Sequence, residues 1–179
     1  MMKFSISILI CLFSFAVQGQ KLSVLDIDSE VSKIDMDPGL EHYSFDTNDV
    51  YNRATDGGGS LEVWLLGKEI RKISQSIFLS NAQFITTVYL KNDQPIMIVE
   101  TENQYPYDEQ RNTFNYAEPE TAYEKIIYSW HWEKDAITVR TRGESWGDEQ
   151  GVDVGSYTSL LATARKILSR DSRQLRGSK

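Results

Sequence analysis

The sequence predicts an α+β fold: an antiparallel β-meander of about six strands, with a short N-terminal helix and a C-terminal amphipathic helix packed on the sheet. Between residues 60 and 141, apolar and polar side chains alternate in short runs, which is the period of half-buried strands. The connections between most runs are too short for a crossover helix, so neighbouring strands should be antiparallel. From Tyr157 to Leu168 the apolar residues instead recur every three or four positions, as on one face of a helix, with Ser156 as its expected N-cap.

The segment at residues 1–19 has the pattern of a secretory signal peptide. Lys3 supplies a basic start, an apolar run extends from Ser5 to Val17, and Val17 and Gly19 stand where a signal peptidase reads small residues. The run is too short for a lasting membrane span. We therefore expect an exported protein in the periplasm, at the cell surface or in the medium, with no transmembrane segment after signal removal.

The only cysteine, Cys11, lies inside this signal. A mature chain without cysteine contains no disulfide, thiol nucleophile or cysteine metal ligand. The alternative is that Cys11 is lipidated. Against it, Ile10 is too bulky for a lipobox and the apolar run continues past the cysteine.

The charge is acidic and unevenly distributed. Without the signal, which contains only Lys3, the chain has 18 basic and 26 acidic residues and a net charge of −8. Residues 165–179 carry +5, so residues 20–164 carry −13. An acidic body argues against nucleic acid as a partner. The basic C-terminal end is typical of a solvated helix terminus, and an acidic lipid or partner is the alternative.

Four segments follow from these patterns: the signal peptide (1–19), an N-terminal segment with a short helix (20–59), a single β-rich domain with the C-terminal helix (60–170) and a basic tail (171–179). The short helix is predicted before Pro38, while residues 39–56 show no clear pattern and residues 57–59 are all glycine. Strands are then expected around turns at 67–68, 80–81, 92–93 and 134–135, with a polar, aromatic loop at 104–121.

Three of the expected hairpins share a loose repeat. Each places an aromatic residue just before a tight turn (Trp64, Tyr89 and Trp130) and an isoleucine after it (Ile70, Ile96 and Ile137). This pattern resembles small exported β-meander proteins of Bacteroides-like bacteria, whose layout of helix, meander and helix is similar over roughly residues 60–170. The usual turn glycine is absent at Asp93 and Asp135. Because these proteins have mostly unassigned functions, the resemblance transfers no site residue.

Two serine-containing patterns resemble nucleophile sites. Gly143–Gly147 matches G-x-S-x-G, but a loop rather than a helix is expected after it and no histidine follows Ser145. Ser129, His131 and Glu133 share one side of a strand, where next-but-one residues lie roughly 6.5–7 Å apart, too far for a proton relay. The sequence therefore predicts no catalytic residue.

One carboxylate pair keeps an enzymatic alternative open. Glu100 and Glu102 are also next-but-one neighbours on a strand, a separation compatible with the two acids of an inverting glycosidase. No metal site is predicted, because His42 and His131 are the only histidines and are distant in sequence. The EF-hand-like start at Asp26 lacks the required glycine, which is replaced by Val31. We also expect no cofactor.

The aromatic residues are the remaining candidates for function. Tyr105, Tyr107 and Tyr116 crowd the loop before the fifth expected strand, and Trp130 and Trp132 share one face of that strand. Strand tryptophans are usually core residues, whereas loop tyrosines are hard to bury. The sequence favours a non-enzymatic exported module that binds an unknown protein or a glycan through these residues. The alternatives are a carboxylate-dependent hydrolase and a structural subunit of an envelope assembly.

Export can be tested directly. We expect the mature chain to begin at Gln20, because cleavage after Gly19 satisfies the small-residue pattern. Mass spectrometry of the exported protein measures this end. A chain that begins at Cys11, or one that keeps residues 1–19, would contradict the prediction of a soluble exported protein.

Overall fold

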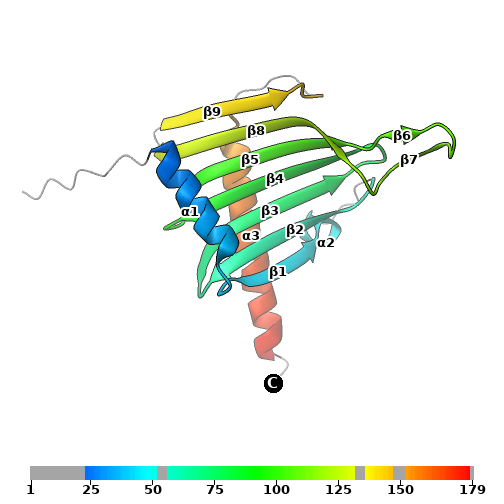
Figure 1. Ribbon diagram of the computed structural model, residues 1–179. Coiled ribbons are helices and arrows are strands. Elements are labelled where there is room, and N and C mark those ends of the chain that lie inside the picture. The colour runs from blue at the N-terminus through cyan, green and yellow to red at the C-terminus, as the bar shows by residue number, and fades with distance from the viewer. Residues whose placement is uncertain (1–22, 52–55, 132–135, 147–151, 178–179) are drawn as a thin grey trace, which may run out of the picture.

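A computed structural model describes residues 23–51, 56–131, 136–146 and 152–177. A seven-stranded antiparallel sheet lies between two helices that cover its opposite faces (Figure 1). This arrangement confirms the predicted α+β class and the packing of a C-terminal helix on the sheet. The expected signal peptide, Cys11, Trp132 and the turn at 134–135 lie outside the described residues.

The strands follow one another in chain order across the main sheet. Its order is β1 (Glu41–Asp46), β2 (Gly59–Leu66), β3 (Glu69–Phe78), β4 (Ala82–Lys91), β5 (Gln94–Gln104), β8 (Glu120–His131) and β9 (Ala136–Gly143). The short strands β6 (Tyr107–Asp108) and β7 (Thr113–Phe114) form a separate hairpin between β5 and β8. Six of the seven main strands match the expected runs. The seventh, β1, lies in the stretch 39–56 that showed no clear pattern.

The tight turns follow the residues that the sequence places there. Gly67 turns between β2 and β3 with a φ of 64°. Asn92 and Asp93 join β4 to β5 with φ values of 51° and 62°, the conformation of a two-residue hairpin. The Asn92 N–H donates to the Glu69 carboxylate at 2.9 Å, so this turn is tied to the neighbouring one.

Helix α3 (Val154–Gly177) covers one face of the sheet. Tyr157, Leu160, Leu161, Ala164 and Ile167 are buried against the inward side chains of five strands. These strand residues are Leu61, Val63, Ile70, Ile73, Val88, Leu90, Ile98 and Ile127. The helix begins two residues before the expected Ser156, at a turn where the Asp153 carboxylate accepts the Gly155 N–H. It continues through residues 171–177, which belong to the basic C-terminal stretch that the sequence indicated as a helix terminus.

Helix α1 (Val24–Met36) covers the other face. Its buried stripe of Ile27, Val31 and Ile34 packs against Tyr89 and Tyr128, together with Ile96 and Met97. Ser23 and Asp26 begin the helix with a reciprocal capping box, which satisfies two backbone N–H groups. Both faces of the central strands are therefore buried.

Ion pairs position α1 on the sheet. The Glu30 carboxylate contacts Arg71 at 2.8 Å and Lys91 at 3.1 Å, and Asp35 contacts Lys72 at 2.7 Å. Burial alone would raise the pKa of Glu30, but the hydrogen bond and charge of Lys91, with Arg71 and Lys33, lower this pKa overall. The carboxylate therefore stays charged in the folded state, and its contacts tie α1 to β3 and β4.

We expect Leu161→Asp to reduce the free energy of unfolding by about 4 kcal/mol, because it places an unpaired charge in the core beneath α3. Urea denaturation followed by circular dichroism measures the change. Ala162→Asp, on the exposed side of the same helix, is the matched control and should cost much less. Equal losses for the two variants would show that α3 is not docked as described.

The Glu30 contacts predict a pH-dependent stability. A lowered folded-state pKa stabilises the protein above the unfolded pKa and loses this effect as the pH falls through the folded pKa. Glu30→Gln should therefore cost about 1 kcal/mol at pH 7, a small value because water still reaches the pair. The difference from the wild type should shrink as denaturation is repeated from pH 5 towards pH 3. A difference that stays constant over this range would contradict the role of the Glu30 charge.

Candidate functional site

Four aromatic rings meet at the β6–β7 hairpin, which projects beyond the ends of β5 and β8 (Figure 1). We call Tyr105, Tyr107, Phe114 and Tyr116 the aromatic platform. Their ring centroids lie 4.9 Å apart for Tyr105 and Tyr116, 5.2 Å for Tyr107 and Phe114, and 6.4 Å for Phe114 and Tyr116. The structure thus brings together the three loop tyrosines that the sequence singled out.

The platform is exposed yet held in place. Tyr107 exposes 51% and Tyr116 exposes 57% of its surface, whereas Tyr105 and Phe114 are half-buried. The Tyr107 hydroxyl donates to Asn112 Oδ1 at 2.6 Å, and the Tyr116 hydroxyl donates to the Ser80 carbonyl at 3.1 Å. These hydrogen bonds give both exposed rings a defined orientation.

Local hydrogen bonds explain why the sequence folds into a hairpin here. Asp108 Oδ1 accepts the N–H groups of Gln110 and Arg111, and Asn112 adopts a φ of 52° that asparagine tolerates. The Asn115 N–H donates to the Pro106 carbonyl at 2.7 Å and closes the base. The acidic side chain of Asp108 thus shapes the turn.

A hollow of about 410 Å³ opens at the base of the platform. It is lined by Asp56, Gly57, Phe78, Leu79, Ser80, Tyr105 and Tyr116. The Ser80 hydroxyl donates to the Asp56 carboxylate at 2.6 Å. A Cβ on Gly57 would lie 2.5 Å from the Phe78 carbonyl oxygen, so only glycine lets this turn approach the end of β3. The sequence indicated a turn at the glycines of residues 57–59 but did not place Asp56 or Gly57 in a site.

The predicted strand tryptophans do not join the platform. Trp130 lies at the opposite end of β8 from the hairpin and packs, half-buried, against the core beneath α1. Trp132 lies outside the described residues. The expected binding set therefore divides into three tyrosines at the platform and one tryptophan at the α1 core.

Glu100 and Glu102 lie on the α3 side of β5, and each has two protein partners. Glu100 accepts the Tyr157 hydroxyl at 2.7 Å and contacts Lys125 Nζ at 3.2 Å. Glu102 accepts the Ser145 hydroxyl at 2.6 Å and the Trp146 N–H at 3.0 Å. These contacts tie α3 and the segment after β9 to the sheet, so both carboxylates have structural roles.

The environment of Tyr157 agrees with this role. Burial raises the pKa of its phenol, and the hydrogen bond to Glu100 raises that pKa further. The phenol therefore remains a proton donor over the physiological range. The serine of the G-x-S-x-G pattern likewise donates to Glu102 and holds a loop in place.

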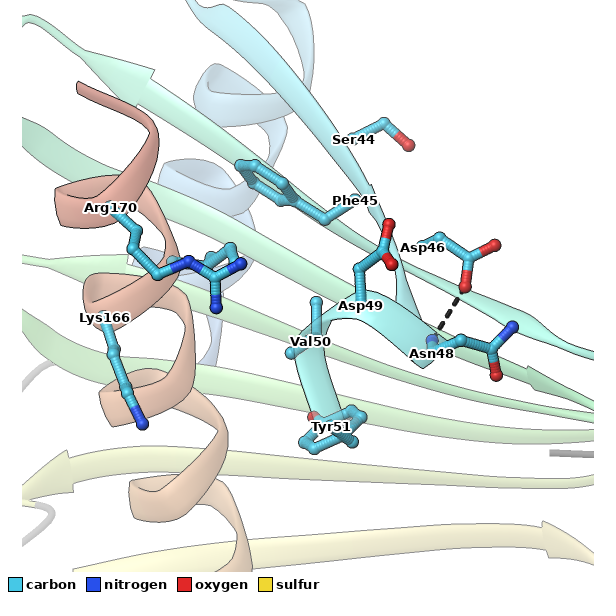
Figure 2. A pocket seen from close by; sticks show the side chains of 10 residues that line it. Ser44, Phe45, Asp46, Asn48, Asp49, Val50, Tyr51, Lys166 and Arg170 are labelled. Atoms are coloured by element: carbon cyan, nitrogen blue, oxygen red, sulfur yellow. Dashed lines mark hydrogen bonds between the residues drawn. The ribbon is translucent and has the colours of Figure 1, made fainter. Parts of the chain in front are cut away.

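A second, larger hollow lies between α2 (Thr47–Tyr51) and α3 and has a volume of about 820 Å³ (Figure 2). Asp46, just before α2, and Asp49, within α2, line one side of it. Lys166 and Arg170 line the other side from α3 (Figure 2). We call this hollow the charged cleft. The sequence did not indicate it, because its two walls are more than 100 positions apart in the chain.

The described residues contain no group of three or more histidine, cysteine or acidic side chains that could hold a metal ion. None of the helices in this part of the chain is both long and apolar enough to cross a membrane. No family model matches the chain, and no curated protein or solved structure matches it either.

Proposed function

We propose that the protein is an exported, non-enzymatic binding module that holds a neutral glycan at its aromatic platform. The proposal depends mainly on the exposure and fixed orientation of Tyr107 and Tyr116. About half of each side chain is exposed, yet each hydroxyl is held by a hydrogen bond. Exposed aromatic surface is unfavourable in water unless a partner covers it. Fixed rings also lower the ordering cost of binding.

The chemistry beside the rings favours a sugar. A sugar ring has an apolar face that packs on an aromatic ring and hydroxyl groups that require polar partners. Tyr105 and Tyr116 supply aromatic surface beside the hollow, while Asp56 and Ser80 supply a carboxylate and a hydroxyl within it. The hollow of about 410 Å³ has the size of a small-ligand site.

Charge narrows the ligand class. The Asp56 carboxylate lines the hollow, and the chain between residues 20 and 164 carries −13. A phosphorylated or uronic-acid ligand would meet repulsion there. A neutral glycan avoids this cost, and its hydroxyl groups can donate to a carboxylate.

The other two functions receive less support. The hydrolase alternative depends on Glu100 and Glu102, whose oxygens already contact protein donors. The assembly alternative has one favourable feature: β9 forms an edge of the main sheet, and Val139 on it is exposed. However, the exposed Arg140 and Arg142 on the same strand are charges of the kind that discourage pairing between edges.

We expect Tyr107→Ala and Tyr116→Ala each to weaken glycan retention roughly tenfold or more, because each removes aromatic contact surface. Immobilised neutral glycans and isothermal titration measure retention, and thermal denaturation checks the fold. Leu66→Ala, an exposed apolar position at the other end of the sheet, is the control and should change neither.

Tyr105→Ala is the informative third variant. Tyr105 is half-buried, so this change should lower stability as well as retention. If all three tyrosine variants lose stability and none alters retention, the platform is core and the binding proposal fails. If the protein retains basic peptides and no glycans, the platform is a binding site but the proposed glycan ligand is wrong.

A further inference from the structure

The charged cleft has two walls of opposite charge. Asp46 and Asp49 lie on one wall and Lys166 and Arg170 on the other, and all four side chains are exposed (Figure 2). None of the ion pairs between described residues joins the two walls. Opposite charges that face a common hollow set up a field across it.

The helical register places the two cations together. Lys166 and Arg170 are four residues apart on α3, so their side chains occupy neighbouring positions on one helix face. An arginine guanidinium can grip a carboxylate through two parallel hydrogen bonds, and a nearby ammonium adds charge. This wall is therefore suited to a carboxylate.

The opposite wall is suited to a cation. Asp46 Oδ1 accepts the Asn48 N–H at 2.7 Å and so helps to begin α2. Asp49 lies in the first turn of α2 and lines the same cleft. Tyr51 is held nearby because its hydroxyl accepts a hydrogen bond from Gln75 Nε2 at 2.6 Å. Asp49 is thus the side chain best placed to meet an ammonium group.

Size and lining limit the ligand further. Phe45, Val50 and Ile167 provide apolar surface between the charged walls. The volume of about 820 Å³ lies within the range of small-molecule sites, near its upper end. A purely anionic ligand would face the two aspartates, and a purely cationic one would face Lys166 and Arg170. A ligand with both charges satisfies both walls.

We propose that the charged cleft binds short peptides with free termini. Asp49 holds the α-ammonium group, Arg170 and Lys166 hold the α-carboxylate, and the apolar floor accepts side chains. The proposal does not depend on the aromatic platform, because none of the residues lining the cleft belongs to it.

The test uses the mature chain and four forms of trialanine: free, N-acetylated, C-amidated and doubly capped. We expect free trialanine to bind. Each cap should raise the dissociation constant roughly tenfold, which corresponds to a loss of about 1.4 kcal/mol of binding free energy. Isothermal titration or chemical-shift perturbation measures binding. Equal affinity for the four forms, or no saturation at millimolar concentration, would overturn the proposal without any variant.

Two variants test which wall of the cleft binds which peptide terminus. Asp49→Asn should abolish the discrimination between free and N-acetylated peptide, and Arg170→Gln should abolish the discrimination between free and amidated peptide. Lys68→Gln, on the exposed turn between β2 and β3, is the charge-matched control and should retain both preferences. Tyr107→Ala should leave trialanine binding unchanged, which separates this site from the platform. If Asp49→Asn and Arg170→Gln keep both preferences, the peptide does not bind in this cleft.

Discussion

The burial of both faces of the central strands is the constraint on which the rest of the structure depends. In β4, Val88, Tyr89 and Leu90 are consecutive and all buried, so their side chains point to opposite faces and each face requires cover. Helices from the two ends of the described chain supply it, α1 on one face and α3 on the other.

In this acidic protein, carboxylates form contacts that hold the two helices and the sheet together. Glu30 and Asp35 hold α1 against cations of β3 and β4, whereas Glu100 accepts the Tyr157 hydroxyl of α3. Glu102 draws the segment after β9 onto the sheet. Each pairing satisfies a polar group that would be costly to leave without a partner near the core. Acidic residues that resemble catalytic pairs in the sequence are, in this fold, contacts between layers.

The two hollows lie where this cover ends. The aromatic platform closes over a loop contact between Asp56 and Ser80, and the charged cleft lies where α2 faces α3. Both combine apolar surface with a few polar groups, as ligand sites commonly do. They differ in electrostatics. The hollow beside the platform is lined by the Asp56 carboxylate and suits a neutral ligand, whereas the cleft presents both signs of charge and suits a zwitterion.

Local patterns in the sequence determined the class of the fold, six of the seven main strands, the Asn92-Asp93 turn, the stripe of α3 and the crowding of tyrosines near the hairpin. Each of these depends on residues close in the chain, where strand and helix periods or turn chemistry can be read directly. Strand β1 escaped prediction because it lies at an edge of the sheet and mixes exposed and half-buried positions. Only the tertiary structure decided that α1 and α3 cover opposite faces, that the half-buried Trp130 packs against the core beneath α1, and that Asp49 and Arg170 line the same cleft. These outcomes depend on register and packing between distant segments, which no local period encodes.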